Sequence, residues 1–161
     1  MLEFDGSFEI REYPSLMMAT TNTQFAAQGD DGSFMRLFRY ISGANDAAQE
    51  VAMTTPVFMQ PNEDEMAGKM GFVIPSKIAP DQVPEQSGSN VEIRERSGGR
   101  FAVIRFDGRL NGASLAAAGE HLRTWMTSRA LLGEEDVETA GYDPPWTPGL
   151  LRRNEVLIRL K

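Results

Sequence analysis

The sequence predicts an α+β domain of two tandem, pseudo-symmetric ββαββ halves, with mainly antiparallel strands in a barrel or strongly curved sheet and two helices outside. The first observation is a repeat: Phe8-Glu9-Ile10-Arg11-Glu12 recurs almost unchanged, 83 residues later, as Val91-Glu92-Ile93-Arg94-Glu95. Both copies alternate apolar and charged residues, which is typical of half-buried strands. Each copy is followed by a second strand pattern and then by helical spacing. Because one half alone has a small core, we expect the halves to join through a pseudo-twofold axis.

The first half, residues 7–75, contains the patterns of four strands and one helix. Asp30, Asp31 and Ser33 offer capping side chains to the helix, and Gly43 is a natural stop. Its apolar face has the i, i+3, i+4, i+7 spacing, in Phe34, Leu37, Phe38 and Ile41. Proline interrupts the third strand, so we expect that strand at an edge or with a bulge. The predicted strands are 8–13, 16–21, 51–59 and 69–74.

The second half, residues 91–160, repeats this order after a connector at 76–90 that is rich in Pro and Gly. Its helix is predicted over 113–132, with Leu115, Ala118, Leu122 and Trp125 on one face. The predicted strands are 91–95, 101–106, 137–140 and 155–160. Residues 1–161 are therefore expected to form a single domain.

A proline-rich arm leads into the last strand. Pro144, Pro145 and Pro148 fix the backbone on either side of Trp146, so the arm is neither helix nor central strand. Two interpretations remain open at this point: the arm is a structural brace that closes the core, or it forms a wall of a ligand cavity.

Composition limits the function classes. Sixteen basic and 23 acidic residues give a net charge of −7, which argues against nucleic acid or an anionic membrane surface as partner. The absence of cysteine excludes disulfides and thiolate chemistry. No apolar run reaches the length of a membrane span, and the acidic start does not resemble a signal peptide. We expect a soluble protein, cytoplasmic by default, with export of a longer precursor as the open alternative.

Few residues suggest catalysis. The single histidine, His121, lies on the second predicted helix; we interpret it as a surface residue, with haem axial ligation as the alternative. No zinc, phosphate-loop or nucleophile motif occurs, so no metal site is predicted. Glu155 enters the last strand beside the arm. It is expected to pair with Arg152 or Arg153, and the alternative is an acid/base role in a small-molecule hydrolase.

Several segments resemble the SOUL haem-binding protein family, and bacterial members in particular. The main ones are Ala52-Met53-Thr54-Thr55-Pro56-Val57 and Tyr142-Asp143-Pro144-Pro145-Trp146-Thr147-Pro148, the latter followed by Arg152-Arg153-Asn154-Glu155-Val156. The opening motif through Pro14, the helix around Tyr40-Ile41-Ser42-Gly43, and Phe101 to Gly108 are also similar. The resemblance covers residues 7 to 160.

This resemblance implies a distorted β-barrel with two helices, which agrees with the repeat. It also implies a non-catalytic protein that binds haem or another tetrapyrrole in an apolar groove at the first helix. Some members use an axial His near that helix, whereas this chain has no His between Phe8 and Pro56. The alternatives are a hydrolase that uses the same cavity and a protein-interaction scaffold. Transferred by position, the ligand-binding residues are Met35, Arg36, Phe38, Arg39, Met53, Met59, Tyr142 and Trp146.

Overall fold

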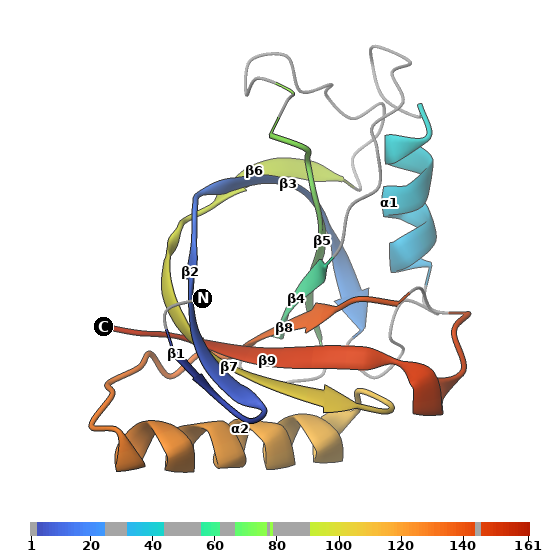
Figure 1. The fold of residues 1–161 in the computed structure, drawn as a ribbon. Helices are drawn as coiled ribbons and strands as arrows, with labels where there is room; N and C mark the ends of the chain where they lie inside the picture. Colours follow the sequence, from blue (N-terminus) through green and yellow to red (C-terminus); the bar gives the residue numbers. More distant parts are fainter. Residues whose placement is uncertain are drawn as a thin grey trace.

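A single antiparallel sheet of nine strands forms the body of the protein (Figure 1). The computed structural model describes residues 3–24, 32–43, 56–61, 67–76, 78, 91–143 and 146–161. The order across the sheet is β1-β2-β7-β9-β8-β4-β5-β3-β6. The strands are β1 Glu3–Asp5, β2 Phe8–Tyr13, β3 Leu16–Gln24, β4 Val57–Pro61, β5 Ala67–Val73, β6 Glu92–Arg96, β7 Gly99–Asp107, β8 Glu138–Gly141 and β9 Arg153–Arg159.

The sheet closes into a ring because the β2–β7 pair near one end of the sheet and the β3–β6 pair at the other end are formed by the same two bent stretches of chain. Strand β2 runs on into β3, and β6 runs on into β7. Tyr13 pairs with Gly99 in the β2–β7 ladder, and Leu16 pairs with Arg96 in the β3–β6 ladder. The residue pairing continues in the same register from one ladder to the other. The two ladders are therefore one antiparallel ribbon with a bend. This ribbon closes the barrel (Figure 1).

The strand pairings repeat between the two halves. Strand β3 pairs with β5 and β5 with β4 in the first half, just as β7 pairs with β9 and β9 with β8 in the second. The β4–β8 pair joins the halves on the side opposite the bent ribbon. The predicted α+β fold, with two pseudo-symmetric ββαββ halves in a distorted antiparallel barrel, is therefore confirmed.

The bend of the ribbon requires a glycine. Equivalent positions of the two halves meet here, and the backbone N–H of Gly98 donates to Oγ of Ser15 at 3.2 Å. A Cβ atom at Gly98 would lie 2.6 Å from the carbonyl oxygen of Tyr13 and 2.8 Å from backbone atoms of Pro14 and Ser15. No other residue type fits there unless the backbone moves.

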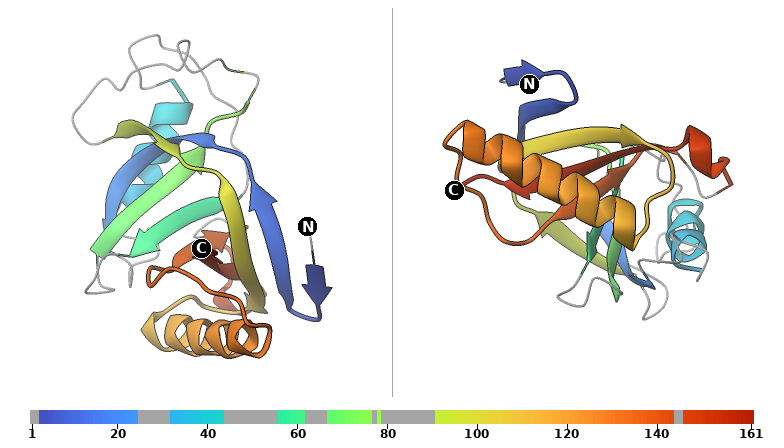
Figure 2. Two further views of the ribbon diagram at one scale, coloured as in Figure 1. Left: turned by 90° about the vertical axis from the view of Figure 1, so that its left-hand side faces the viewer. Right: turned by 90° about the horizontal axis from the view of Figure 1, so that it is seen from below.

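Both helices pack on the outside of the ring (Figures 1 and 2). Helix α1, Ser33–Ile41, lies against β3 and β5, and α2, Gly112–Ser128, lies against β7 and β9. A capping box between Asn111 and Ser114 begins α2. Neither helix is long and apolar enough to cross a bilayer. The main hydrophobic core therefore lies between the helices and the outer face of the strands, while a second apolar cluster lies on the opposite face of the sheet.

Two predicted helices differ from the structure, and the structure has one additional strand. Helix α2 ends at Ser128 instead of residue 132, because Ala130 adopts the left-handed backbone at φ 53°, and Leu132 is consequently 73% exposed. Helix α1 begins after Gly32, at φ 89°, which provides no capping side chain. The short strand β1 was not predicted. Most of the predicted connector at 76–90 and the start of the predicted strand 51–59 lie outside the described residues.

Candidate functional site

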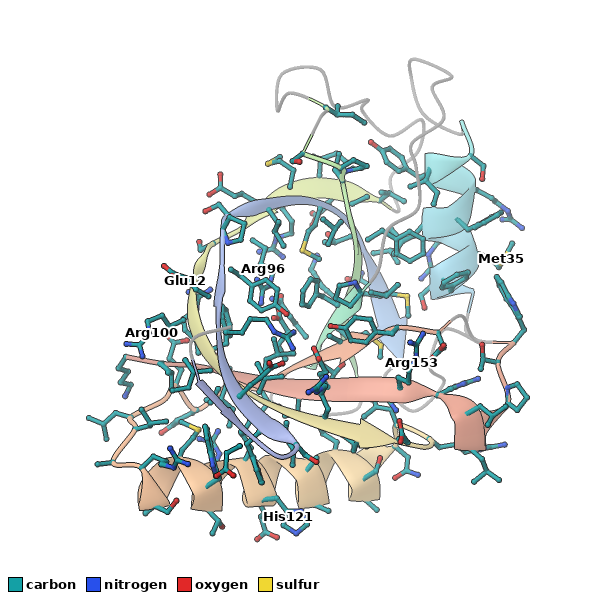
Figure 3. All side chains as sticks on the ribbon, viewed as in Figure 1. Glu12, Met35, Arg96, Arg100, His121 and Arg153 are labelled. Atoms are coloured by element: carbon teal, nitrogen blue, oxygen red, sulfur yellow. The ribbon has the colours of Figure 1, made fainter. Side chains whose placement is uncertain are left out.

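Helix α1 carries apolar side chains on two of its faces. The inward face buries Phe34, Leu37, Tyr40 and Ile41. Met35 and Phe38 lie on the outward side, where they are 42% and 37% exposed. Figure 3 shows Met35 on the side of α1 that faces away from the ring of strands. Phe38 was predicted as part of the buried face, and its ring instead lies at the edge of that face.

The proline-rich arm places Trp146 against this helix. The ring centroids of Trp146 and Phe34 are 5.5 Å apart, and the rings meet edge to face at 88°. The Phe34 and Phe38 rings are 6.3 Å apart and nearly parallel. Trp146 keeps 69% of its surface exposed. We define the α1–Trp146 surface as the exposed side chains of Met35, Phe38 and Trp146; it is apolar, and its indole ring stands steeply to the Phe38 ring.

Polar contacts hold the arm in place on both sides of Trp146. The Arg153 backbone N–H donates to Oδ2 of Asp143 at 2.7 Å, and its guanidinium donates to both carboxylate oxygens. The Arg153 pairing lowers the pKa of Asp143 below its ordinary value. Nε of Arg152 donates to the Thr147 carbonyl at 2.9 Å. A short helix, η3 Gly149–Leu151, then leads into β9. The arm is therefore braced by its own flanking residues and still presents its tryptophan outward.

The two arginines of α1 have different environments. Arg36 donates to Oγ1 of Thr21 at 3.0 Å and to the Asn22 carbonyl at 2.6 Å, so it fastens α1 to β3. Arg39 is exposed in the last turn and has no hydrogen bond or ion pair to any residue that the structure describes. Arg39 is thus the cation of this helix that is available for an anionic group on a ligand.

Glu155 lies inside the barrel, away from the α1–Trp146 surface. It is 2% exposed. The two terminal nitrogens of Arg11 each donate to one of its carboxylate oxygens, both at 2.9 Å. The Tyr142 hydroxyl donates to Oε2 of Glu155 at 2.8 Å. Arg11 also contacts Glu9, which is 1% exposed, and the Tyr13 hydroxyl. One half-buried arginine therefore balances two buried carboxylates.

The tyrosine and arginine side chains of this cluster have shifted pKa values. Burial, with the nearby charge of Glu155, raises the pKa of Tyr142 above its ordinary value. Burial also raises the pKa of Tyr13. Burial acts to lower the pKa of Arg11, but its hydrogen bonds to Glu155 and Tyr13 outweigh that effect and raise it overall. Arg11 therefore keeps its charge, and the two tyrosine hydroxyls keep their protons, at neutral pH.

The structure corrects the expected partner of Glu155. Arg152 and Arg153, which were expected to pair with it, instead bind Thr147 and Asp143. No pattern in the sequence predicted this role for Arg11. Glu9 and Arg11 share one face of β2 and were interpreted as the solvent-facing side of a half-buried strand, but in the closed barrel Glu9 is buried and Arg11 is half-buried.

The predicted ligand-binding residues fall into separate places. Trp146 contacts Phe34 of α1, the helix that also carries Met35, Arg36, Phe38 and Arg39. Met59 is buried in the core beneath α1, and Tyr142 lies with Glu155 in the barrel. Met53 is outside the described residues.

His121 lies on the exposed side of α2, and Figure 3 shows it below that helix, pointing away from the sheet and far from Met35 on α1. In the described ranges no group of three acidic, histidine or cysteine side chains could hold a metal ion.

Sequence comparisons give one consistent result. A family model described as SOUL heme-binding protein matches residues 1–159. Heme-binding protein 1 of Mus musculus is 35% identical over 129 residues, covering 76% of this chain and 67% of the mouse protein. Heme-binding protein 1 of Xenopus laevis is 28% identical, covering 96% of this chain and 84% of the frog protein. The chain spans about two thirds of the length of the mouse and Bos taurus relatives.

Solved structures share the fold at low sequence identity. A hydrolase from Listeria innocua matches with a TM-score of 0.71 and 9% identity, covering 96% of this chain and 92% of that one. The C-terminal domain of EcmrR matches with a TM-score of 0.67 and 12% identity, covering 96% of both chains. These similarities show a common architecture with the two-helix barrel described above.

Proposed function

Because this chain belongs to the SOUL heme-binding protein family, we propose that it binds haem or another tetrapyrrole on the α1–Trp146 surface. The observation that carries the proposal is the edge-to-face contact between Trp146 and Phe34, which leaves Trp146, Phe38 and Met35 exposed together. The names of the relatives, heme-binding proteins 1 and 2, support the ligand class. A tetrapyrrole is a broad apolar ring, and the exposed indole and phenyl rings, which stand at a steep angle to each other, provide apolar contacts for its face and its edge.

The charged part of the ligand has a partner on the same helix. Haem carries two propionates, and guanidinium groups bind carboxylates with two parallel hydrogen bonds. Arg39 is exposed at the end of α1 and uncommitted within the described part of the chain. We infer that it pairs with a propionate, while Arg36 keeps the helix in position.

The residues fit the ring of a haem better than they fit its iron. No histidine lies on α1 or on the described part of the arm, and Met35 is the only side chain of the α1–Trp146 surface with an atom that could ligate iron. When bound, haem would supply a redox-active, visibly coloured iron centre. The protein's own contribution is the apolar face and the arginine, so iron is not required for binding.

The two alternatives have less support. A hydrolase centred on Glu155 would need a free carboxylate, whereas both oxygens of Glu155 are engaged by Arg11 and Tyr142. A protein-interaction scaffold could use the same exposed side chains, and no observation favours it over a tetrapyrrole.

Titration of the protein with haemin and, separately, with metal-free protoporphyrin IX tests the proposal. We expect both to bind saturably at about one per chain, with a Kd in the micromolar range or tighter, about −8 kcal/mol. Similar affinities would follow from a site that recognises the ring and propionates. Linear, unsaturable uptake of both compounds would overturn the proposal. Saturation by haemin alone would show that iron ligation dominates, which the α1–Trp146 surface does not explain.

A further inference from the structure

Arg96 is a buried arginine at the end of β6, on the inner face of the barrel. Its side chain is 4% exposed. Figure 3 shows it inside the ring of strands, among aromatic side chains. It lies apart from the α1–Trp146 surface and has no part in the proposed function.

Three aromatic rings enclose the guanidinium. Its central carbon lies 4.3 Å from the ring centroid of Phe58, 4.6 Å from that of Phe101 and 4.9 Å from that of Tyr13. Tyr13 meets the rings of Phe58 and Phe101 edge to face, so the three rings also support one another. Phe101 is shared with a second guanidinium, that of Arg159. Such ring faces attract cations most strongly where water is excluded.

A carboxylate completes the enclosure. Nε of Arg96 lies 3.0 Å from both oxygens of Glu138, and Nη2 also donates to this carboxylate. Gln60 donates to Oε2 of Glu138 at 2.7 Å, which fixes the orientation of the carboxylate. The remaining nitrogen, Nη1, is buried and has no hydrogen-bond partner in the part of the chain that the structure describes. Nη1 thus belongs to a guanidinium whose described neighbours include three aromatic rings.

We propose that the barrel interior is a recognition site for guanidinium-type cations, which the protein occupies with its own Arg96. Three ring faces and one carboxylate match a planar, weakly hydrated cation in both shape and charge. While Arg96 fills this site, the interior is closed to other ligands. Removal of the Arg96 side chain leaves Glu138 without its counter-ion and leaves room for a free guanidinium compound.

Chemical rescue of Arg96→Ala with methylguanidinium chloride tests this inference. We expect the variant to melt well below the parent protein. Methylguanidinium should then raise its melting temperature saturably, by roughly 5–10 °C at a hundredfold excess over Kd. Urea, a neutral molecule of similar shape, and sodium chloride at equal concentration should give no such rise. Arg94→Ala, an exposed arginine on the same strand, is the matched control and should respond like the parent.

Each outcome bears on the inference. A saturable rise confined to Arg96→Ala and to the cationic compound supports it. An equal response of the parent or of Arg94→Ala, or equal rescue by urea, would overturn it. If Arg96→Ala does not fold, refolding with and without methylguanidinium becomes the readout, followed by circular dichroism. Recovery of folded protein only with the cation supports the inference, and failure under both conditions contradicts it.

Discussion

Replacement of Arg11 by Met is expected to lower the free energy of unfolding by about 3–5 kcal/mol. Arg11 is the described cation that contacts both Glu9 and Glu155, which are 1% and 2% exposed. Methionine fills similar space but supplies neither charge nor donors. Both carboxylates would then remain buried and uncompensated, which costs far more than the loss of an exposed pair.

Urea unfolding at neutral pH measures this effect. Lys69→Met is the control, because it removes the exposed Lys69–Glu92 pair and should change stability by no more than about 1 kcal/mol. The pH dependence separates charge from packing. In Arg11→Met, burial raises the pKa of both carboxyls above the unfolded value of about 4.3. The deficit relative to the parent should therefore be greatest at neutral pH and shrink as the pH falls through those raised values. A deficit independent of pH would mean that packing is the cause.

Replacement of Trp146 by Ala is expected to weaken protoporphyrin IX binding roughly tenfold or more, with little change in stability. The indole is 69% exposed, so the folded protein loses little burial when it is removed. In the proposed complex the same exposed ring contacts the ligand directly. Fluorescence or absorption titration of the purified variant measures the change in Kd.

Two matched variants give this prediction its specificity. Leu132→Ala removes another large exposed apolar side chain, 73% exposed beside α2, and His121→Ala removes the only histidine. Both should bind protoporphyrin IX and haemin as the parent does. Equal weakening in Trp146→Ala and Leu132→Ala would indicate non-specific adhesion. Loss of haemin binding in His121→Ala would show that haemin binds at α2, through this histidine, and not at the α1–Trp146 surface.

Much of the fold is predictable from the sequence because its local patterns are strong. The repeat at Phe8 and Val91 predicts two equivalent halves, and the equivalent strand pairings confirm them. Helix ends are less predictable: the left-handed backbone at Ala130 ends α2 early, and alanine gives no local sign of it.

The barrel interior could not be predicted from these patterns. An alternating strand such as β2 has one apolar and one charged face, and a charged face normally lies in water. Here the closed ribbon turns Glu9 and Arg11 inward, where Glu155 from β9 meets them. That contact joins residues 144 positions apart, and only the closed topology brings them together.

The candidate site can be predicted from the sequence less fully than the fold, but better than the barrel interior. The stiff arm and the first helix could each be predicted, and the family resemblance pointed to both. Their contact through Phe34 and Trp146 depends on how β9 and β3 are placed in the sheet. No spacing in the sequence encodes that placement. The sequence also does not distinguish Arg36, which fastens α1 to β3, from Arg39, which remains exposed.

The most direct test of the α1–Trp146 surface is a map of backbone amide NMR shifts during titration with protoporphyrin IX, which lacks iron and its line broadening. We expect the changes to concentrate in α1, Ser33–Ile41, and in residues 146–151 of the arm and η3, with β7 and α2 unaffected. Changes centred on α2 around His121, or on the inner strands around Glu155, would contradict this expectation.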